Sequence, residues 1–449
     1  MEQKNLHHAL HITHELCNGC SHCMKVCPTQ AIRVREGKAL LHPDWCVDCG
    51  ECIRVCPVSA IKIAADDFQR IFDYEHRLLV LPSIFFGQFN NYISQEMVNS
   101  ILIDMGFTEV HVPEESVDLL LEVMNHYIEE NPRPVISSFC PAVIRLIQVR
   151  FPSLVNNVMR LKQPMELTAH HLRHIYSENH KIDPASVGIF YVTPCVAKIA
   201  SIKSPVGNYV SPIDGVINMD YLYNRVQKES VKKLSDNIEA APVLTLHDQI
   251  QLSSRAMQYT LTNGEKDNLW QAGLAVDGLQ NVIDILEHLE NDKIEGVDYL
   301  ELRVCDESCA GGILAPSNRF FAAERLRRMA KNLPNESWMP KKQAEYLASI
   351  VNVGPIAPRS VVRYHPDVNE ALKMTEKAHK VKKTLPGIDC GACGTPSCEA
   401  LSEDIVCGRS TVDACLFQRI KHGKAGKLSM DEAVNIMEEI WGSDKFVDK

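Results

Sequence analysis

Two cysteine runs near the start of the chain decide the architecture of its first segment: CNGCSHCMKVCP at 17–28 and CVDCGECIRVCP at 46–57. Each run has the spacing C-x2-C-x2-C-x3-C-P. Such a run presents three thiolates to one face of an iron–sulfur cube, while its fourth thiolate reaches a second cube. A zinc ribbon instead uses two CxxC pairs separated by a longer stretch. The runs therefore predict two [4Fe-4S] clusters and a role in electron transfer.

The same spacing is typical of bacterial two-cluster ferredoxins, in which the fourth cysteine of each run binds the other cluster. We therefore predict an α+β ferredoxin domain over residues 1–72. Its first cluster is expected on Cys17, Cys20, Cys23 and Cys56, and its second on Cys46, Cys49, Cys52 and Cys27.

Composition narrows the class of protein further. The chain has 449 residues, with 47 Lys and Arg against 57 Asp and Glu, so its formal net charge is −10. That balance argues against a nucleic-acid partner. No apolar run reaches the ~18 residues that span a bilayer, and the first residues lack the apolar core of a signal peptide. We expect a cytoplasmic protein without membrane contact, whose 17 cysteines are mainly metal ligands.

The central segment, residues 73–365, alternates apolar strand-like runs with amphipathic helical patterns, which predicts an α/β domain with parallel strands. The strand-like runs span 78–84, 109–112, 134–138, 187–193, 215–219 and 299–304. The helical patterns span 97–105, 117–128, 143–151, 167–176 and 279–289.

The last segment, residues 366–449, is predicted to be a small, mostly helical domain with a third [4Fe-4S] cluster. Its sequence LPGIDCGACGTPSCEALSEDIVCGRSTVDAC at 385–415 is similar to the small FeS domain of other redox proteins. That resemblance implies four ligands, which are Cys390, Cys393, Cys398 and Cys415. Cys407 is left over as a packed helix residue.

Four scattered cysteines remain: Cys140, Cys195, Cys305 and Cys309. An isolated cysteine is usually a small buried hydrophobe. Each of these four, however, closely follows a predicted strand, and the carboxyl ends of the strands of a doubly wound sheet converge on one crevice. Four thiols in one crevice predict a metal site.

These cysteines lie in three stretches that resemble the signatures TSCCPxW, MPCxxKxxE and ExxxCxxGC of the [FeFe] hydrogenases. The stretches are Ser137–Pro141, Thr193–Ser201 and Glu301–Cys309. The resemblance implies an H-cluster, which is a [4Fe-4S] cube joined to a [2Fe] unit with CO, cyanide and a bridging dithiolate. It implies that Cys140, Cys195, Cys305 and Cys309 ligate the cube, that Cys309 bridges to the di-iron unit, and that Lys198 hydrogen-bonds an iron-bound cyanide.

The chain departs from this family along the family's proton path. Phe139 stands where a cysteine carries protons, and a phenyl ring has no exchangeable proton. The family's acidic D-L-T-I-x-E-E helix is matched to Asp118–Met124, where we expect its glutamates to be missing. Thr193 and Arg303 replace two methionines. These changes predict slow turnover, although Phe139 could instead be a simple core aromatic.

We therefore expect an [FeFe] hydrogenase-like enzyme of an anaerobic bacterium, closest to the sensory type. It would oxidise dihydrogen and reduce protons with low turnover. Its expected partners are a ferredoxin or a signalling protein, through which any sensory output acts, and hydrogenase maturation factors. One alternative is a non-catalytic iron–sulfur protein for electron transfer or cluster assembly on the same fold. Another is an ordinary hydrogenase with a different proton path.

Overall fold

The computed structural model describes residues 6–207, 209–236, 252–359, 364 and 367–447. Its contacts divide the chain into two compact units. The large unit comprises Met1–Ala9 and Ala65–Pro358, and the small unit comprises Leu10–Ala64 and Arg359–Lys449. The two predicted cluster-binding end domains therefore share one unit. The three-domain division stays a prediction, and its boundary at residues 365–366 lies outside the described residues.

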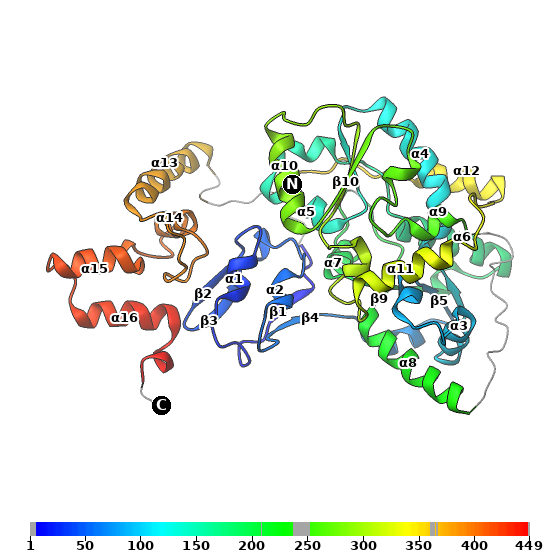
Figure 1. Ribbon diagram of the computed structural model, residues 1–449, viewed down its shortest axis with the longest axis horizontal. Helices are drawn as coiled ribbons and strands as arrows, with labels where there is room; N and C mark the ends of the chain where they lie inside the picture. Colours follow the sequence, from blue (N-terminus) through cyan, green and yellow to red (C-terminus); the bar gives the residue numbers. More distant parts are fainter. Residues whose placement is uncertain (1–5, 208, 237–251, 360–363, 365–366, 448–449) are drawn as a thin grey trace. The chain divides into compact units, whose positions relative to one another are not determined.

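Two parallel sheets form the centre of the large unit (Figure 1). The first has the strand order β6-β5-β8-β9 and the second the order β10-β11-β7, with every pairing parallel. The strands are β5 (His76–Val80), β6 (Glu109–His111), β7 (Val135–Ile136), β8 (Val187–Thr193), β9 (Gly215–Asn218), β10 (Gly273–Asp277) and β11 (Tyr299–Arg303).

The most buried strand shows why these segments extend. In β8, VGIFYVT, all seven residues are buried. β-Branched and aromatic side chains favour a pleated strand, and a parallel strand covered on both faces is apolar throughout. The six predicted strands are confirmed. The structure adds β10, whose residues are all only half-buried, and it divides the strands between two sheets.

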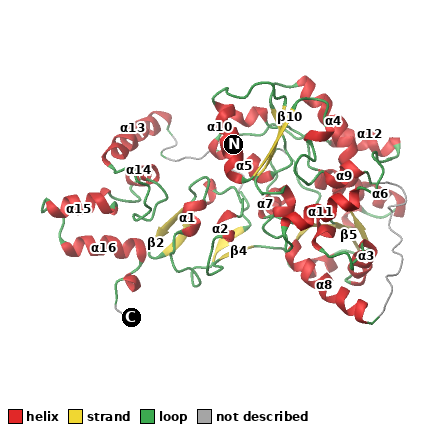
Figure 2. Ribbon diagram, in the orientation of Figure 1, coloured by secondary structure: helices red, strands yellow, loops and turns green. Residues whose placement is uncertain are grey.

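Helices accompany both sheets, as the secondary-structure colouring shows (Figure 2). In α10, the buried residues Val282, Ile283, Leu286 and Leu289 form one apolar stripe at helical spacing. The helices of the large unit are α3 (Gln95–Asp104), α4 (Val117–Glu130), α5 (Pro141–Arg150), α6 (Pro164–His180), α7 (Val196–Lys203), α8 (Met219–Ser235), α9 (Ser254–Gln258), α10 (Leu279–Glu290), α11 (Arg319–Ala330) and α12 (Lys341–Ile350). The five predicted helices are all among them.

The first part of the small unit is a duplicated structure. Antiparallel pairs join β1 (Leu10–Ile12) to β4 (Ile61–Ile63) and β2 (Ile32–Arg35) to β3 (Lys38–Leu41). The short helices α1 (His22–Val26) and α2 (Glu51–Arg54) each contain the third cysteine of a run. Left-handed backbone recurs at equivalent places in the two copies, which are Gly19 and Asp48, Ser21 and Gly50, and Gln30 and Ser59. The repeat read from the cysteines is therefore a repeat of the backbone.

The second part of the small unit is helical, as predicted. Its helices are α13 (Val368–Thr384), α14 (Cys398–Val406), α15 (Leu416–Lys424) and α16 (Met430–Trp441). Leu385, Leu401, Ala414 and Ile440 form its apolar core together with three of the cysteines. None of the helices in the described ranges is long and apolar enough to cross a membrane. The predicted fold class, α/β with parallel sheets, an α+β first segment and a helical last segment, is confirmed.

Candidate metal centres

Backbone N–H groups point at the sulfur atoms of the first segment in a repeated pattern. The amide of Ala31 donates to Cys27 Sγ at 3.2 Å, and the amide of Ala60 donates to the equivalent sulfur of the second run, Cys56 Sγ, at 3.2 Å. The amide of Ala39 donates to Cys17 Sγ at 3.3 Å. Such donors orient and stabilise ligating thiolates. The backbone is therefore arranged for anionic sulfur.

The first predicted ligand set is electrostatically coupled. Burial raises the pKa of Cys23 to about 12, and the charges of Cys17, Cys20 and Cys56 add to the effect. Thiols that repel one another in this way ionise together only when a metal holds them, with release of their protons. The three cysteines that act on Cys23 are those predicted to share its cluster.

In the second predicted ligand set, the fourth cysteine again comes from the other run. Burial and then the charge of Cys27 raise the pKa of Cys52 to about 12 and also raise the pKa of Cys49. The pKa of Cys46 is raised by burial, by Asp48 and also by Cys27. Cys27 thus acts on the cysteines of the other run. Both donor sets fit four-thiolate cubes, and the ligand assignments stay predictions.

The C-terminal cysteines also gather. Cys393, Cys398 and Cys415 are buried in the apolar core of the helical part, whereas Cys390 is exposed. Burial raises the pKa of Cys393, and the neighbouring charge of Cys390 adds to the rise. Four thiols, one of them facing solvent, fit a cluster near the surface. This ligand set, too, stays a prediction.

A buried ion-pair network fixes the C-terminal segment on the ferredoxin-like segment within the small unit. Asp404 is 1% exposed and accepts from Arg33 Nε at 2.8 Å and Arg35 Nη2 at 3.1 Å. The amide of Val34 donates to the carbonyl of Gly394 at 2.9 Å. Gly394 has φ +70°, and a Cβ there would lie 2.3 Å from the Val34 carbonyl oxygen. The loop that carries Cys393 therefore lies directly against β2.

In the large unit, the four scattered cysteines follow strand ends, as predicted. Cys140 follows β7 and caps α5, and Cys195 follows β8 and caps α7. Cys305 lies in the turn after β11, and Cys309 in the 3-10 turn Ser308–Gly311. The thiols come from strands of both sheets.

Three of these thiols act on one another. Burial raises the pKa of Cys195 to about 12, with Lys198 opposing and Cys309 and Cys140 adding to the rise. Burial also raises the pKa of Cys309, and Cys140 again contributes. Cys305 stands shortly before Cys309 on the same loop and is half-buried. The donor set fits a thiolate-bound cube, and the ligand assignment stays a prediction.

Lys198 places a buried ammonium group beside these thiols. Its side chain is 4% exposed, and its Nζ donates to Tyr191 Oη at 3.2 Å. Among the residues that the structure describes, Tyr191 is its only hydrogen-bond acceptor, although an ammonium carries three donors. Burial opposes its charge, but Tyr191, Cys309 and Cys195 raise the pKa of Lys198 above its ordinary value. The group remains charged and has donors to spare.

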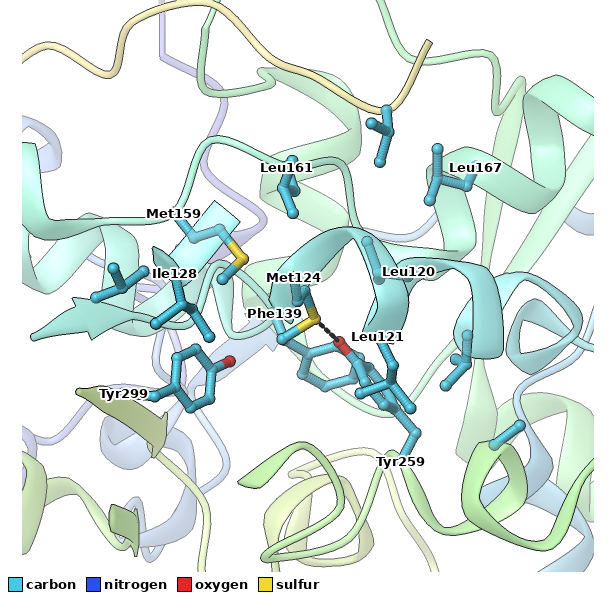
Figure 3. Close-up of a cluster of buried hydrophobic side chains, with 14 of the residues drawn as sticks. Leu120, Leu121, Met124, Ile128, Phe139, Met159, Leu161, Leu167, Tyr259 and Tyr299 are labelled. Carbon is cyan, nitrogen blue, oxygen red and sulfur yellow. Dashed lines mark hydrogen bonds between the residues drawn. The ribbon is translucent and has the colours of Figure 1, made fainter. Parts of the chain in front are cut away.

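Phe139 lies between cations and an apolar cluster. Its ring centroid is 4.3 Å from Lys198 Nζ and 3.8 Å from Arg303 Cζ, and Tyr259 packs edge-on at 5.3 Å. Figure 3 shows Phe139 beside Tyr259 and Met124, whose sulfur accepts from the tyrosine hydroxyl at 3.7 Å. Cys309 packs against the same cluster. Phe139 therefore packs as a core aromatic and also lies beside Lys198 and Arg303, so its position fits both a structural role and a functional one.

Arg303 belongs to a polar network that sequence reasoning missed. The side chain is 2% exposed, with Nη2 3.2 Å from Glu265 Oε2 and Nε 3.6 Å from Glu301 Oε1. Glu265 also accepts from the hydroxyls of Tyr259 at 2.6 Å and Tyr299 at 3.0 Å. The only sequence signal for this network was the arginine in place of a methionine.

The expectation that acidic groups are missing around Asp118–Met124 is corrected by two glutamates just before that stretch, and their part in a proton path stays a proposal. Glu114 and Glu115 are buried in the turn Pro113–Ser116, just before α4. Burial raises the pKa of Glu114 to about 7, and the charge of Glu114 contributes to the raised pKa of Cys309. The stretch VHVPEE at 110–115 fits the L-T-I-x-E-E pattern better than a match that begins at Asp118, because it ends on two glutamates.

Comparisons with known protein families agree with this geometry. Residues 83–258 match the iron only hydrogenase large subunit, C-terminal domain. The chain is hydrogenase-like. Residues 16–60 match the 4Fe-4S dicluster domain, and residues 385–417 match an Fe-S cluster family. A segment similar to the 4Fe-4S dicluster domain therefore precedes the segment similar to the hydrogenase domain, and a second segment similar to an Fe-S cluster family follows it.

Individual relatives are more distant. The chain is 26% identical over 148 residues to iron hydrogenase 1 of Clostridium pasteurianum, covering 32% of this chain and 25% of that protein. It is 51% identical over 35 residues to one component of the Na(+)-translocating ferredoxin:NAD(+) oxidoreductase complex of Acetobacterium woodii, covering 8% and 10%. The chain thus spans a quarter or less of these relatives' lengths. A variant of [FeFe]-hydrogenase HydA1 from Chlamydomonas reinhardtii is similar in structure, with a TM-score of 0.46 and 15% identity over 66% of this chain and 96% of that one.

Proposed function

We propose that this chain is an [FeFe] hydrogenase-type oxidoreductase that interconverts dihydrogen with protons and electrons at a low rate. The observation that carries the proposal is the buried ammonium of Lys198 beside Cys195 and Cys309. A cubane cluster alone needs no such cation. An ammonium with unused donors in a dry pocket suits an anionic ligand such as cyanide, because charge-assisted hydrogen bonds are the strong ones.

Each residue near the pocket has a proposed role. Cys140, Cys195, Cys305 and Cys309 would hold the cube, with Cys309 also shared with the di-iron group. Lys198 would orient that group through an iron-bound cyanide. When bound, the di-iron group supplies an open iron position for dihydrogen and an amine that exchanges a proton. The apolar cluster around Phe139 would exclude water from this side of the pocket.

Slow proton exchange follows from Phe139. Glu114, whose pKa is about 7, can hold or release a proton near neutral pH. A phenyl ring cannot pass that proton on. The path would therefore be interrupted at a single residue, with acidic groups still present beyond it.

A slow enzyme with three further clusters fits a sensor of hydrogen or redox state. The two-cluster segment and the C-terminal cluster would exchange electrons with a partner, such as a ferredoxin or a signalling protein. The relative in Acetobacterium woodii is itself named for ferredoxin. Maturation factors would be needed to insert the di-iron group.

A non-catalytic electron-transfer or assembly protein is the second candidate, and one observation favours it. Phe139 and Arg303 are larger than the cysteine and methionine expected at their positions, so they could take up room that a di-iron group needs. Spectroscopy of the di-iron ligands separates the two candidates.

Replacement of Lys198 tests the proposed role of its ammonium group. We expect maturated wild-type protein to oxidise dihydrogen slowly with an artificial one-electron acceptor, and Lys198→Met to lose at least tenfold of that rate. A hydrogen bond to a charged group is worth about 1.5–3 kcal/mol, which corresponds to roughly 10- to 150-fold. Gas uptake, normalised to the iron content, measures it.

The matched control is Lys203→Met, because Lys203 lies on the same helix α7 but pairs with Asp66 at 2.7 Å. This control should keep the wild-type rate. Equal rates in the two variants, or no hydrogen oxidation by the maturated wild type, would contradict the proposal.

A further inference from the structure

The guanidinium of Arg303 is held rigidly inside the large unit. Glu265 and Glu301 lie on its Nη2 and Nε sides, at 3.2 Å and 3.6 Å. Its Cζ stacks 3.8 Å from the centroid of the Phe139 ring. Glu301 is itself fixed, because the amides of Glu265 and Lys266 donate to its Oε2 at 3.1 Å and 2.9 Å. The ion pair with Glu265 and the stacking on Phe139 therefore set the orientation of the guanidinium.

Two nitrogens of this guanidinium, Nε and Nη1, make no hydrogen bond in the described part of the chain, and only Nε lies beside a carboxylate, Glu301 at 3.6 Å. Nη1 therefore has no acceptor among the described residues, although Arg303 is 2% exposed. A buried donor without a partner destabilises the folded protein, and more so when it is charged. Native proteins rarely leave such groups unsatisfied. The unpaired nitrogen therefore indicates a partner that is not part of the protein.

Two ring contacts and one electrostatic interaction place this donor beside the candidate metal centre of the large unit. Arg303 and Lys198 both lie over the ring of Phe139. Phe139 directly precedes the predicted ligand Cys140. Both cations also act electrostatically on Cys309. The unpaired donor is thus near the thiol expected to join cube and di-iron group.

We propose that Arg303 is a positioning residue of the di-iron group, whose Nη1–H donates a hydrogen bond to one of its anionic ligands. This inference rests on the proposed function. Lys198 would hold one cyanide and Arg303 a second negatively charged ligand. Two fixed cations would also stabilise the more reduced, more negative states of the bound cluster, because opposite charges attract strongly in a dry site.

The test compares maturated wild type with Arg303→Met and Arg303→Lys. Methionine removes the charge. Lysine keeps a charge that can pair with Glu265, but it lacks the second terminal nitrogen of the guanidinium, which corresponds to Nη1. We expect a shift of at least one cyanide stretching band in the infrared spectrum of both variants. We also expect the reduction potential of the cluster to fall in Arg303→Met and to fall less in Arg303→Lys.

Two further variants complete the design. Arg303→Met leaves Glu265 and Glu301 without their cation, so Arg303→Met combined with Glu265→Gln provides a version with less buried negative charge. Arg319→Met, at a half-exposed arginine paired with Asp306, is the matched control and should leave bands and potential unchanged.

The outcomes separate the two proposals. Wild-type cyanide bands that stay unshifted in both Arg303 variants overturn the role of Arg303 and leave the hydrogenase proposal intact. Wild-type protein without such bands overturns both. Shifted bands together with a lowered potential support the inference, and they do so whatever the rate of hydrogen turnover.

Discussion

The variant Phe139→Cys is expected to raise hydrogen turnover at least tenfold. A thiol with an ordinary pKa near 8.5 can exchange a proton at the position where the phenyl ring cannot. Acid–base groups in such positions typically contribute 10²- to 10⁴-fold. Glu114 is already buried within electrostatic reach of Lys198 and Cys309, so we expect one substitution to complete the path. The rate of viologen-linked hydrogen oxidation per mole of di-iron group measures the effect.

The controls separate proton transfer from a change of space. Phe139→Ala opens a similar cavity without an exchangeable proton, and it should give no gain. Both variants should lose stability, because replacing a buried phenylalanine by alanine costs about 3–5 kcal/mol. A gain in Phe139→Ala equal to that in Phe139→Cys would show that the ring limits turnover sterically and would refute the interrupted path.

The second large effect concerns the small unit, where Asp404→Asn is expected to lower stability by about 3–5 kcal/mol. Asparagine keeps the shape of the side chain but removes the charge that Arg33, Arg35 and Arg409 share. Arg33 is 2% exposed and would be left as an uncompensated buried cation. In a unit of this size, the loss corresponds to a fall in melting temperature of about 10 °C. Bleaching of the visible iron–sulfur absorbance on heating reports it.

Asp413→Asn is the matched control, because Asp413 is 28% exposed and pairs with His422. Exposed pairs contribute about 0–1 kcal/mol, so its melting temperature should hardly change. Electron paramagnetic resonance should show that Asp404→Asn loses the C-terminal cluster first, since Asp404 lies on α14, the helix that begins at Cys398. Unchanged melting in Asp404→Asn would mean that this network does not hold the segment.

Structural features that depend on a short stretch of sequence, such as the cluster-binding loops and the buried strand β8, could be predicted. The spacing of each cysteine run specifies a tight loop, and the structure repeats its left-handed positions at equivalent places in the two runs. The apolar run VGIFYVT specifies a buried strand by its composition alone. In contrast, β10 has half-buried residues and a short sequence, GLAVD, so its pattern did not distinguish it from a loop.

Features that depend on distant pairings could not be predicted. Arg303 at the end of β11 meets Glu265 from a separate segment before β10, and Arg33 meets Asp404 from the other end of the chain. In the sequence alone, these charged residues are not distinguishable from charged residues on the surface, because their burial depends on partners far away in the chain. Glu114 and Glu115 stand in the sequence just before Asp118–Met124, so a match of the family pattern to that stretch passes over them.

Infrared spectroscopy of protein produced together with hydrogenase maturation factors tests the central proposal most directly. The wild type should show stretching bands of iron-bound carbon monoxide and cyanide, and Cys309→Ala should lose them. Bands in the wild type would establish a di-iron group beside Lys198 and the four thiols. Fully maturated protein that contains its iron–sulfur cubes but shows no such bands would contradict the proposal and leave an electron-transfer protein on a hydrogenase-like fold.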